Sequence, residues 1–285
     1  MRLDELIKTV QKIDLLSNTV SKQKLAGSNP SPFKGRGIVF DSIRKYEPGD
    51  DVRDINWKVT ARFTDTYVNT YNEDKVRRVW LLVDVSGSSL VGTNKRSKID
   101  LEVESAATLA YSAIRKNDSV GVIFFSDKIE RLIMPVKGMS GFWYIARALV
   151  ESKPCAGTTS IDVALNFLMK INTSSSLVFI VSDFLTTGYE RACATFSQQN
   201  DVLTVRVFDK IEYKLPKLGW VKLRDIESGN EKWINTYKGH FDTLHQENHT
   251  KQLENYTSFL NKNGIKNIAV GTDEDMIEKL SFLMS

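Results

Sequence analysis

A carboxylate and two hydroxyls follow one apolar segment of the chain at alternating positions. The run Val79-Trp80-Leu81-Leu82-Val83 leads directly into Asp84-Val85-Ser86-Gly87-Ser88. A nearly continuous run of this kind is typical of a parallel strand that is buried on both faces. Open α/β sheets bind ligands outside the carboxyl ends of their strands, so these side chains can converge on one point. Their hard oxygen atoms suit Mg²⁺, Mn²⁺ or Ca²⁺ better than zinc or copper.

Taken alone, Asp-x-Ser-x-Ser is also consistent with an ordinary strand-to-helix turn. Two further loops add the same chemistry. Ala156-Gly157-Thr158-Thr159-Ser160 precedes a helix that we expect over 161–171, and the apolar run 177–181 ends in Ser182-Asp183-Phe184. The residues that we predict to form one site are Asp84, Ser86, Ser88, Thr159 and Asp183.

The order of these motifs resembles the metal-ion-dependent adhesion site of von Willebrand factor A domains. In that fold, Asp-x-Ser-x-Ser is followed by a Thr in a Gly-Thr loop and then by an Asp after a later strand. The resemblance implies that the five side chains hold Mg²⁺, or Mn²⁺ or Ca²⁺, in a site that can also stand empty. The usual Gly-Gly-Thr reads Ala-Gly-Thr-Thr here. Spacing to Ala164-Leu165 of the following helix selects Thr159, with Thr158 as the alternative.

Alternating strand and helix signals after Arg77 predict an α/β fold, with a mostly parallel sheet flanked by helices. The strands that we expect are 79–84, 120–125, 177–181, 202–208 and 266–270, with a hairpin arm at 129–134. The helices that we expect are 98–116, 141–151, 161–171, 187–199, 242–262 and 273–284. Alternation around a Glu-Ser-Gly-Asn turn predicts a β-hairpin insertion at 219–237.

The segments before Arg77 are of two kinds. Residues 1–34 read as an amphipathic helix over about the first 25 positions and a polar linker, and residues 35–76 as a β-rich extension. Charged residues crowd around Trp57 in the extension, and we expect them to form an ion-pair network with a buried Trp57 as its anchor. Such a network is either a clasp that ties the extension to the main sheet of 77–285 or a docking surface for a partner.

Motifs in the extension make the family resemblance more specific. These motifs are Gly35-x-Gly37, Arg44-x-Tyr46-x-Pro48-Gly49-Asp50-Asp51-x-Arg53-x-Ile55-x-Trp57 and Ala61-Arg62. Followed by Asp-x-Ser-x-Ser, they resemble domain-of-unknown-function family 58, whose members carry a von Willebrand A-like (Rossmann-like) domain. Members are commonly paired with MoxR-type AAA+ ATPases, so the resemblance implies such an ATPase as a partner in chaperone-like maturation or metal insertion.

Composition narrows the class of protein. The chain has 285 residues, of which 41% are apolar, and no apolar run approaches the roughly 20 residues of a membrane-spanning helix. Acidic residues near the start argue against a signal peptide, and Cys155 and Cys193 lack metal-ligand spacing, so we expect reduced thiols in the cytoplasm. The net charge of +4 is too small, and too interleaved with acidic residues, to indicate nucleic-acid binding.

The sequence does not indicate an enzyme. It contains no Gly-x-x-x-x-Gly-Lys-Ser/Thr phosphate loop, and Ser86 has no evident His or Lys partner. We therefore predict a non-catalytic, metal-dependent interaction module, an adaptor or co-chaperone that binds a partner carboxylate through the metal. One alternative is a scaffold that needs no metal. Another, less favoured, is a metal-dependent hydrolase centred on Asp84, which would need a Lys and further carboxylates at strand ends. We also expect Asp183 to lie on a solvent-facing loop.

Overall fold

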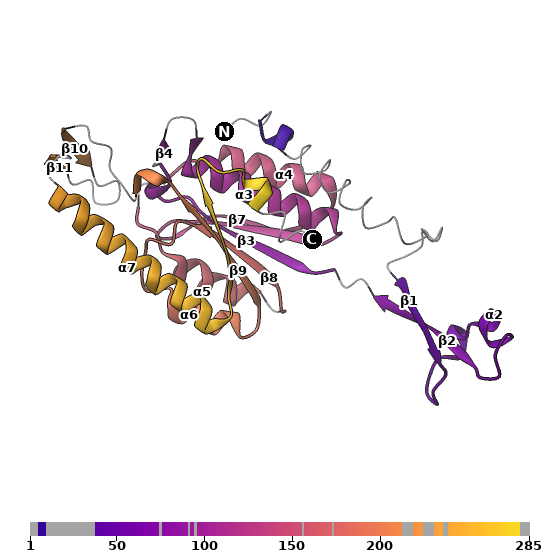
Figure 1. Cartoon of the computed structure of the whole chain (residues 1–285). Coiled ribbons are helices and arrows are strands. Elements are labelled where there is room, and N and C mark those ends of the chain that lie inside the picture. The colour runs from indigo at the N-terminus through magenta and orange to yellow at the C-terminus, as the bar shows by residue number, and fades with distance from the viewer. Residues whose placement is uncertain are drawn as a thin grey trace. The chain divides into compact units, whose positions relative to one another are not determined.

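The computed structural model describes residues 5–9, 38–73, 76–90, 92–93, 96–155, 157–172, 174–212, 219–224, 231–235 and 239–279. The chain divides into two compact units, one formed by Ser21–Val76 and the other by Met1–Val20 with Arg77–Ser285. Figure 1 labels many of the elements of both units. Most of the N-terminal helix that we expected, and the linker after it, lie outside the described residues.

The larger unit is built on a six-stranded sheet with strand order β12-β9-β8-β3-β6-β7. The strands are β3 (Arg78–Asp84), β6 (Ser119–Phe125), β7 (Ile129–Val136), β8 (Leu177–Ser182), β9 (Asp201–Phe208) and β12 (Lys266–Gly271). All neighbours pair in parallel except β7, which pairs antiparallel with β6 at the sheet edge. The mostly parallel sheet that the sequence predicts is confirmed.

Strand β3 lies in the interior of the sheet, between β8 and β6. Its alternate residues enter two different hydrophobic cores, because successive side chains of a strand point to opposite faces. Val79, Leu81 and Val83 belong to one core, and Trp80 and Leu82 belong to the other. Burial on both faces explains why this strand has almost no polar residue before Asp84.

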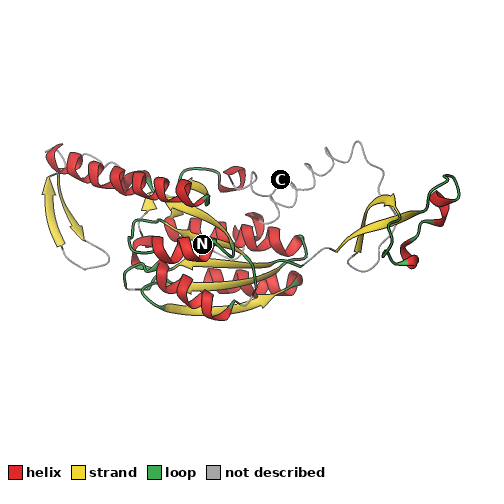
Figure 2. Ribbon diagram, turned by 90° about the horizontal axis from the view of Figure 1, so that it is seen from below, coloured by secondary structure: helices red, strands yellow, loops and turns green. Residues whose placement is uncertain are grey.

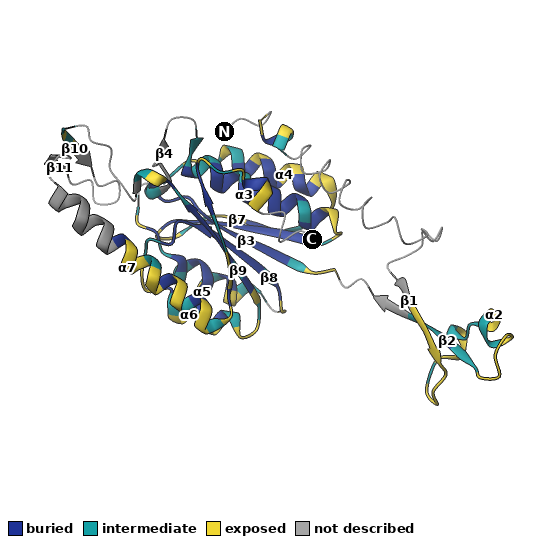
Figure 3. Ribbon diagram, viewed as in Figure 1, coloured by how far each residue is buried: buried dark blue, intermediate teal, exposed yellow. Residues whose placement is uncertain are grey.

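Helices cover both faces of the sheet, as Figures 1 and 2 show. One core takes residues from α3 (Lys98–Arg115) and α4 (Gly138–Glu151). The other takes residues from α5 (Ile161–Ile171), α6 (Glu190–Ser197) and α7 (Gly239–Asn263). The buried residues in Figure 3 line the sheet and the helix faces turned toward it. None of the described helices is long and apolar enough to cross a membrane.

Two small hairpins complete the larger unit. Strands β4 (Gly92–Thr93) and β5 (Arg96–Ser97) pair just before α3, and β10 (Trp220–Arg224) and β11 (Glu231–Asn235) form the hairpin expected at 219–237. Short 3-10 turns lie at η3 (Gly87–Leu90) and η4 (Lys210–Glu212). Residues 5–9 are helical, with Leu6 in the core, and the helix expected at the C-terminus is described over residues 276–279.

The smaller unit is an antiparallel pair of β1 (Ile38–Lys45) and β2 (Tyr67–Glu73), with η2 (Val52–Asp54) and α2 (Trp57–Thr60) between them. Trp57 is not buried within the smaller unit, where 66% of its surface is exposed. Helix α2 has only four residues, none of them buried, so it brings no apolar layer over the indole. The charged residues form separate exposed ion pairs: Arg44 with Asp50, Arg53 with Asp51, and Lys45 with Asp65.

Candidate site at the carboxyl edge of the sheet

Two loops bring hydroxyl groups together beyond the end of β3. The Ser86 hydroxyl lies 2.7 Å from the Thr159 hydroxyl and 2.9 Å from that of Ser88. Thr159 is buried whereas its neighbour Thr158 is exposed, so the structure brings Thr159 to Ser86. These residues are 73 positions apart in the chain, and only the sheet makes them neighbours.

Backbone hydrogen bonds hold the loops in this arrangement. The Cys155 amide donates to the Val85 carbonyl at 2.7 Å, and the Ser160 amide donates to the Ser126 carbonyl at 2.9 Å. These two bonds attach the loop of Thr159 to the ends of β3 and β6. The Thr186 hydroxyl donates to the Thr159 carbonyl at 3.0 Å, which attaches the loop after β8 to the same residue.

Asp84, the last residue of β3, is fully buried. One carboxylate oxygen accepts the Ser86 amide at 2.9 Å, and the other accepts the Ser182 hydroxyl at 2.7 Å. Burial and the nearby negative charge of Asp183 raise the Asp84 pKa to about 6, although the hydrogen bonds from Ser182 and Ser86 act in the opposite direction. The same charge interaction places Asp183 in the electrostatic neighbourhood of Asp84.

Asp183 does not lie on a solvent-facing loop, and that expectation is wrong. Its side chain is 4% exposed, and its Oδ2 accepts a hydrogen bond of 2.8 Å from the ammonium of Lys98, which is 1% exposed. Its Oδ1 accepts the Leu185 amide at 3.1 Å. Asp183 is buried because α3 begins beside the end of β8 and supplies a cation to it.

The next residue, Phe184, has a positive φ of 57°, a conformation that is uncommon for a large side chain. Its buried ring is packed against Tyr256, with centroids 4.8 Å apart, and against Tyr189 at 5.9 Å. The Ser182 hydroxyl accepts the Phe184 amide at 3.3 Å. The ring packing and this hydrogen bond together hold the turn that carries Asp183.

Sequence reasoning missed Lys98 and Ser182 as members of the site. The signal for Lys98 was the spacing Ser97-x-x-Asp100, because a capping box marks Lys98 as the first residue of a helix. A helix that follows a parallel strand begins at the carboxyl edge of the sheet, beside the ligand-binding loops. Ser182 was visible as the polar residue that ends the apolar run of β8.

The oxygen atoms of Asp84, Ser86, Ser88, Thr159 and Asp183, called the edge site below, are of the kind that hard divalent cations prefer. Among the described residues, no three His, Cys, Asp or Glu side chains gather as a metal-binding group, so a cation here would depend on the hydroxyls. The donor atoms therefore fit Mg²⁺ or Mn²⁺. The charge of the edge site suits a divalent cation less well than its donor atoms do, because the Lys98 ammonium already neutralises one of the two carboxylates.

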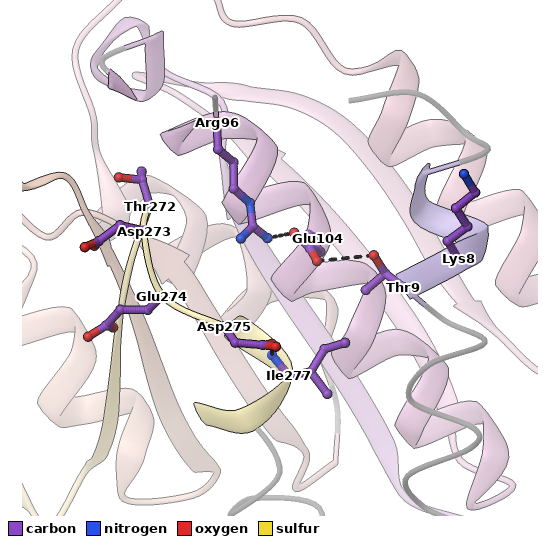
Figure 4. Close-up of a pocket in the computed structure, with 9 residues that line it drawn as sticks. All are labelled: Lys8, Thr9, Arg96, Glu104, Thr272, Asp273, Glu274, Asp275 and Ile277. Carbon is purple, nitrogen blue, oxygen red and sulfur yellow. Dashed lines mark hydrogen bonds and ion pairs between the residues drawn. The ribbon is translucent and has the colours of Figure 1, made fainter. Parts of the chain in front are cut away.

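A separate pocket of about 410 Å³ lies where residues 5–9, α3 and the loop after β12 meet (Figure 4). It contains none of the five predicted residues. Its lining includes the ion pair of Arg96 with Glu104 and a hydrogen bond of 3.2 Å from the Thr9 hydroxyl to Glu104. Opposite charges in this pocket thus interact with one another, and Figure 4 shows these contacts as dashed lines.

Known proteins resemble this chain in sequence and in fold. The uncharacterized protein Rv1480 of Mycobacterium tuberculosis is 30% identical over 215 residues, which cover 73% of this chain and 68% of that protein. An uncharacterized protein of Mycobacterium bovis, Mb1516, matches with the same identity and coverage.

Solved structures with a similar fold include BatB from Bacteroides thetaiotaomicron and the SpRpn10 VWA domain. BatB is 16% identical with a TM-score of 0.49, over 72% of this chain and 96% of that chain. The SpRpn10 VWA domain is 8% identical with a TM-score of 0.44, over 72% of this chain and 94% of that chain. The family model described as "Protein of unknown function DUF58" matches residues 42–255. With most of its length matched by that model, the chain belongs to the DUF58 family.

Proposed function

We propose that this protein is a non-catalytic interaction module that binds a partner protein at the edge site, with a divalent cation as the bridge. The observation that supports this proposal is the contact of the Ser86, Ser88 and Thr159 hydroxyls beside two carboxylates at the carboxyl ends of β3 and β8. Neutral hydroxyls leave a cation with unneutralised charge, so an acidic side chain from a partner is the natural additional ligand.

Four of the five residues of the edge site have a definable part in this proposal. The hydroxyls of Ser86, Ser88 and Thr159 would supply neutral oxygen ligands, and Asp84 would orient the Ser86 loop through the Ser86 amide. When bound, Mg²⁺ or Mn²⁺ would supply the positive charge that attracts a partner carboxylate. Most of the binding energy would come from the surface around the site, because a few anchored contacts dominate protein interfaces.

The partner class and the compartment are also proposals. The resemblance to family 58 implies a MoxR-type AAA+ ATPase, which the protein would serve as an adaptor or co-chaperone. We place this work in the cytoplasm, where the free thiols of Cys155 and Cys193 would stay reduced.

The contacts of Asp84 and Ser86 argue against hydrolysis as the function. Asp84 is fully buried and both of its carboxylate oxygens already accept hydrogen bonds, so it offers no free oxygen to attack a phosphate. The Ser86 hydroxyl contacts two other hydroxyls, neither of which is basic enough to take up its proton. A phosphoryl-transfer hydrolase centred on Asp84 would also need a lysine that faces its substrate, whereas Lys98 is buried against Asp183.

The second candidate is a scaffold that binds its partner without metal. The observation that favours it is the Lys98–Asp183 ion pair, which already supplies a positive charge to the edge site. The two candidates predict opposite responses to chelation. Partner binding weakens in EDTA if a metal forms the bridge, and is unchanged in EDTA if the scaffold suffices.

The test is affinity capture of a MoxR-type ATPase from a lysate of the source organism, with the whole chain as bait, in Mg²⁺ and in EDTA. Thr159→Ala removes one hydroxyl of the edge site, and Thr158→Ala is the matched control because that neighbouring hydroxyl is exposed. We expect Thr159→Ala and EDTA each to reduce capture, and Thr158→Ala to behave as wild type. Equal capture by all three proteins would exclude the edge site as the interface. Metal-dependent hydrolysis of a phosphate ester, lost in Asp84→Asn, would make the protein an enzyme.

A further inference from the structure

Lys98 is a buried cation at a position where two physical effects disfavour a positive charge and a third disfavours the burial of a lysine side chain. Its side chain is 1% exposed, so the ammonium has lost most of its hydration. It is the first residue of the 18-residue helix α3, and the positive end of a helix dipole lies at that end. Lysine also loses more side-chain entropy on burial than most residues. A favourable contact that opposes these effects is the hydrogen-bonded ion pair with Asp183.

The position of this ammonium is fixed by the start of α3. The Ser97 hydroxyl accepts the Asp100 amide at 3.3 Å, and the Asp100 carboxylate accepts the Ser97 amide at 3.3 Å. This capping box sets where the helix begins, so the Lys98 side chain leaves the first turn beside the end of β8. The ammonium donates to Oδ2 of Asp183, while Oδ1 is held by the Leu185 amide. A metal ion would therefore meet an Asp183 whose two oxygens both have partners.

Stability alone does not account for such a pair. Buried ion pairs are often no more stable than well-packed apolar residues of the same volume, because desolvation offsets the Coulomb attraction. The pair also involves one of the two carboxylates of the edge site rather than a random core position. Its place in the molecule thus indicates a role in the chemistry of that site.

We propose that Lys98 is the built-in cation of the edge site, and that its ammonium competes with a divalent metal ion for Asp183. This inference rests on the proposed function only in taking the edge site as the place where a cation binds. Without metal, the ammonium neutralises Asp183 and keeps the loop after β8 in place. A divalent cation that uses Asp183 must displace the ammonium or bind beside it, and both are unfavourable. Lys98 therefore lowers the affinity of the site for metal.

The experiment is calorimetric titration of the whole chain with Mn²⁺ alone, after removal of metals with EDTA. Lys98→Met removes the charge and keeps the length of the side chain, whereas Lys98→Arg keeps the charge. Lys210→Met is the matched control, because Lys210 pairs with Asp273 at the surface, where both side chains are largely exposed. We expect Lys98→Met to bind Mn²⁺ at least about tenfold more tightly than wild type, since removing a nearby positive charge favours a second cation. Lys98→Arg and Lys210→Met should match wild type.

Thermal unfolding of the same variants gives a second readout. Lys98→Met leaves Asp183 buried without its cation, so its midpoint should fall in EDTA and recover in millimolar Mn²⁺. The double variant Lys98→Met/Asp183→Asn removes both charges, and should fold without metal and show no such response. If Lys98→Met stays unfolded in Mn²⁺ while the double variant folds, metal cannot replace the ammonium and the proposal is wrong.

Equal Mn²⁺ affinity of folded Lys98→Met and wild type, including no binding by either, would also overturn the proposal. These outcomes are separable from failure of the proposed function, which is read from partner capture by Thr159→Ala and Thr158→Ala. A combined outcome is that Lys98→Met binds Mn²⁺ more tightly than wild type while capture of the partner is the same in EDTA as in Mg²⁺. That pair of results would support the role of Lys98 and exclude the metal ion as the bridge to the partner.

Discussion

Two lysine–aspartate pairs of this protein have similar geometry and very different surroundings. Lys98 and Asp183 are 2.8 Å apart and almost wholly buried, whereas Lys210 and Asp273 are 2.5 Å apart with 73% and 49% of their side chains exposed. Water screens the surface pair, so its contribution to stability is small. No water replaces a lost partner in the buried pair. The same chemical change should therefore have different effects at the two positions.

We expect Asp183→Asn to lower the free energy of unfolding by about 3–5 kcal/mol, because it removes the counter-charge that Asp183 supplies to the buried Lys98 ammonium. Asp273→Asn, its surface counterpart, should change stability by less than about 1 kcal/mol. Urea unfolding of both variants and wild type in EDTA measures the difference. Equal stability of Asp183→Asn and wild type would mean that the ammonium reaches water in solution, contrary to its burial here.

The carboxyl of Asp84 makes stability depend on pH in the direction opposite to most acidic residues. Folding raises its pKa from the usual 3.8 to about 6. A carboxyl of this kind stabilises the folded state while protonated, so its contribution is complete below about pH 3.8 and is lost as the pH rises through about 6.

We therefore compare wild type with Asp84→Asn, which cannot titrate, at pH 7 and pH 5. Relative to the variant, wild type should gain roughly 1 kcal/mol of unfolding free energy as the pH falls from 7 to 5, because the folded state takes up a proton at Asp84. Chemical denaturation of both proteins in EDTA provides the measurement. If the two proteins show the same change with pH, Asp84 is already fully ionised or fully protonated across this range.

At the scale of the element, the neighbouring strand β6 leaves the space that the large Trp80 side chain of β3 occupies. Trp80 of β3 is paired with Gly121 of β6, and the indole covers that glycine. A Cβ added at Gly121 would lie 2.5 Å from a Trp80 ring carbon, much closer than packed carbon atoms allow. Strand β3 thus accommodates the buried indole of Trp80 because the paired residue of β6, Gly121, has no side chain.

Gly121→Ala should destabilise the protein by roughly 1–3 kcal/mol, the usual range for overpacking a core. In a Trp80→Leu background the smaller side chain should relieve the clash, so the same substitution should have a clearly smaller effect. A double-mutant cycle by urea unfolding yields this coupling energy. Additive effects of the two substitutions would show that the indole moves away from Gly121 without loss of stability.

At the scale of the whole molecule, the two compact units differ in how they are held together. The larger unit has two hydrophobic cores on either side of its sheet. The smaller unit leaves Val52, Trp57 and Phe63 more than half exposed, and its ion pairs lie at the surface. Within its own unit, Trp57 is therefore not part of a hydrophobic core.

Trp57→Ala should accordingly shift the thermal midpoint by no more than about 2 °C, as surface substitutions generally do. Trp80→Ala removes a buried tryptophan and should lower the midpoint by several degrees, because such a loss costs about 3–5 kcal/mol. Differential scanning calorimetry of both variants distinguishes the positions. A large loss of stability in Trp57→Ala would restore the clasp. Normal stability with weaker capture of the ATPase would identify Trp57 as part of a docking face.

The sequence by itself determined the architecture of the larger unit. Apolar runs such as that of β3 can be buried only in the interior of a sheet, and helices 161–171 and 98–115 follow from the spacing of their apolar residues. Because parallel strands all end at one edge, Asp84 and Asp183 could be assigned to that edge without a structure. The spacing from Thr159 to its helix selected the hydroxyl that lies against Ser86.

Only the tertiary structure decided which side chains fill the space around that edge. Lys98 and Asp183 are 85 residues apart, and their contact depends on where α3 begins relative to the end of β8. The sequence around Lys98 gives no sign of Asp183, and the sequence around Asp183 gives no sign of Lys98. From the sequence we therefore predicted that Asp183 lies on a solvent-facing loop. The exposure of the Trp57 side chain could not be predicted from the sequence either, because an indole is buried only where another layer of the chain covers it. Local patterns set the elements, whereas burial and charge pairing are properties of distant segments packed together.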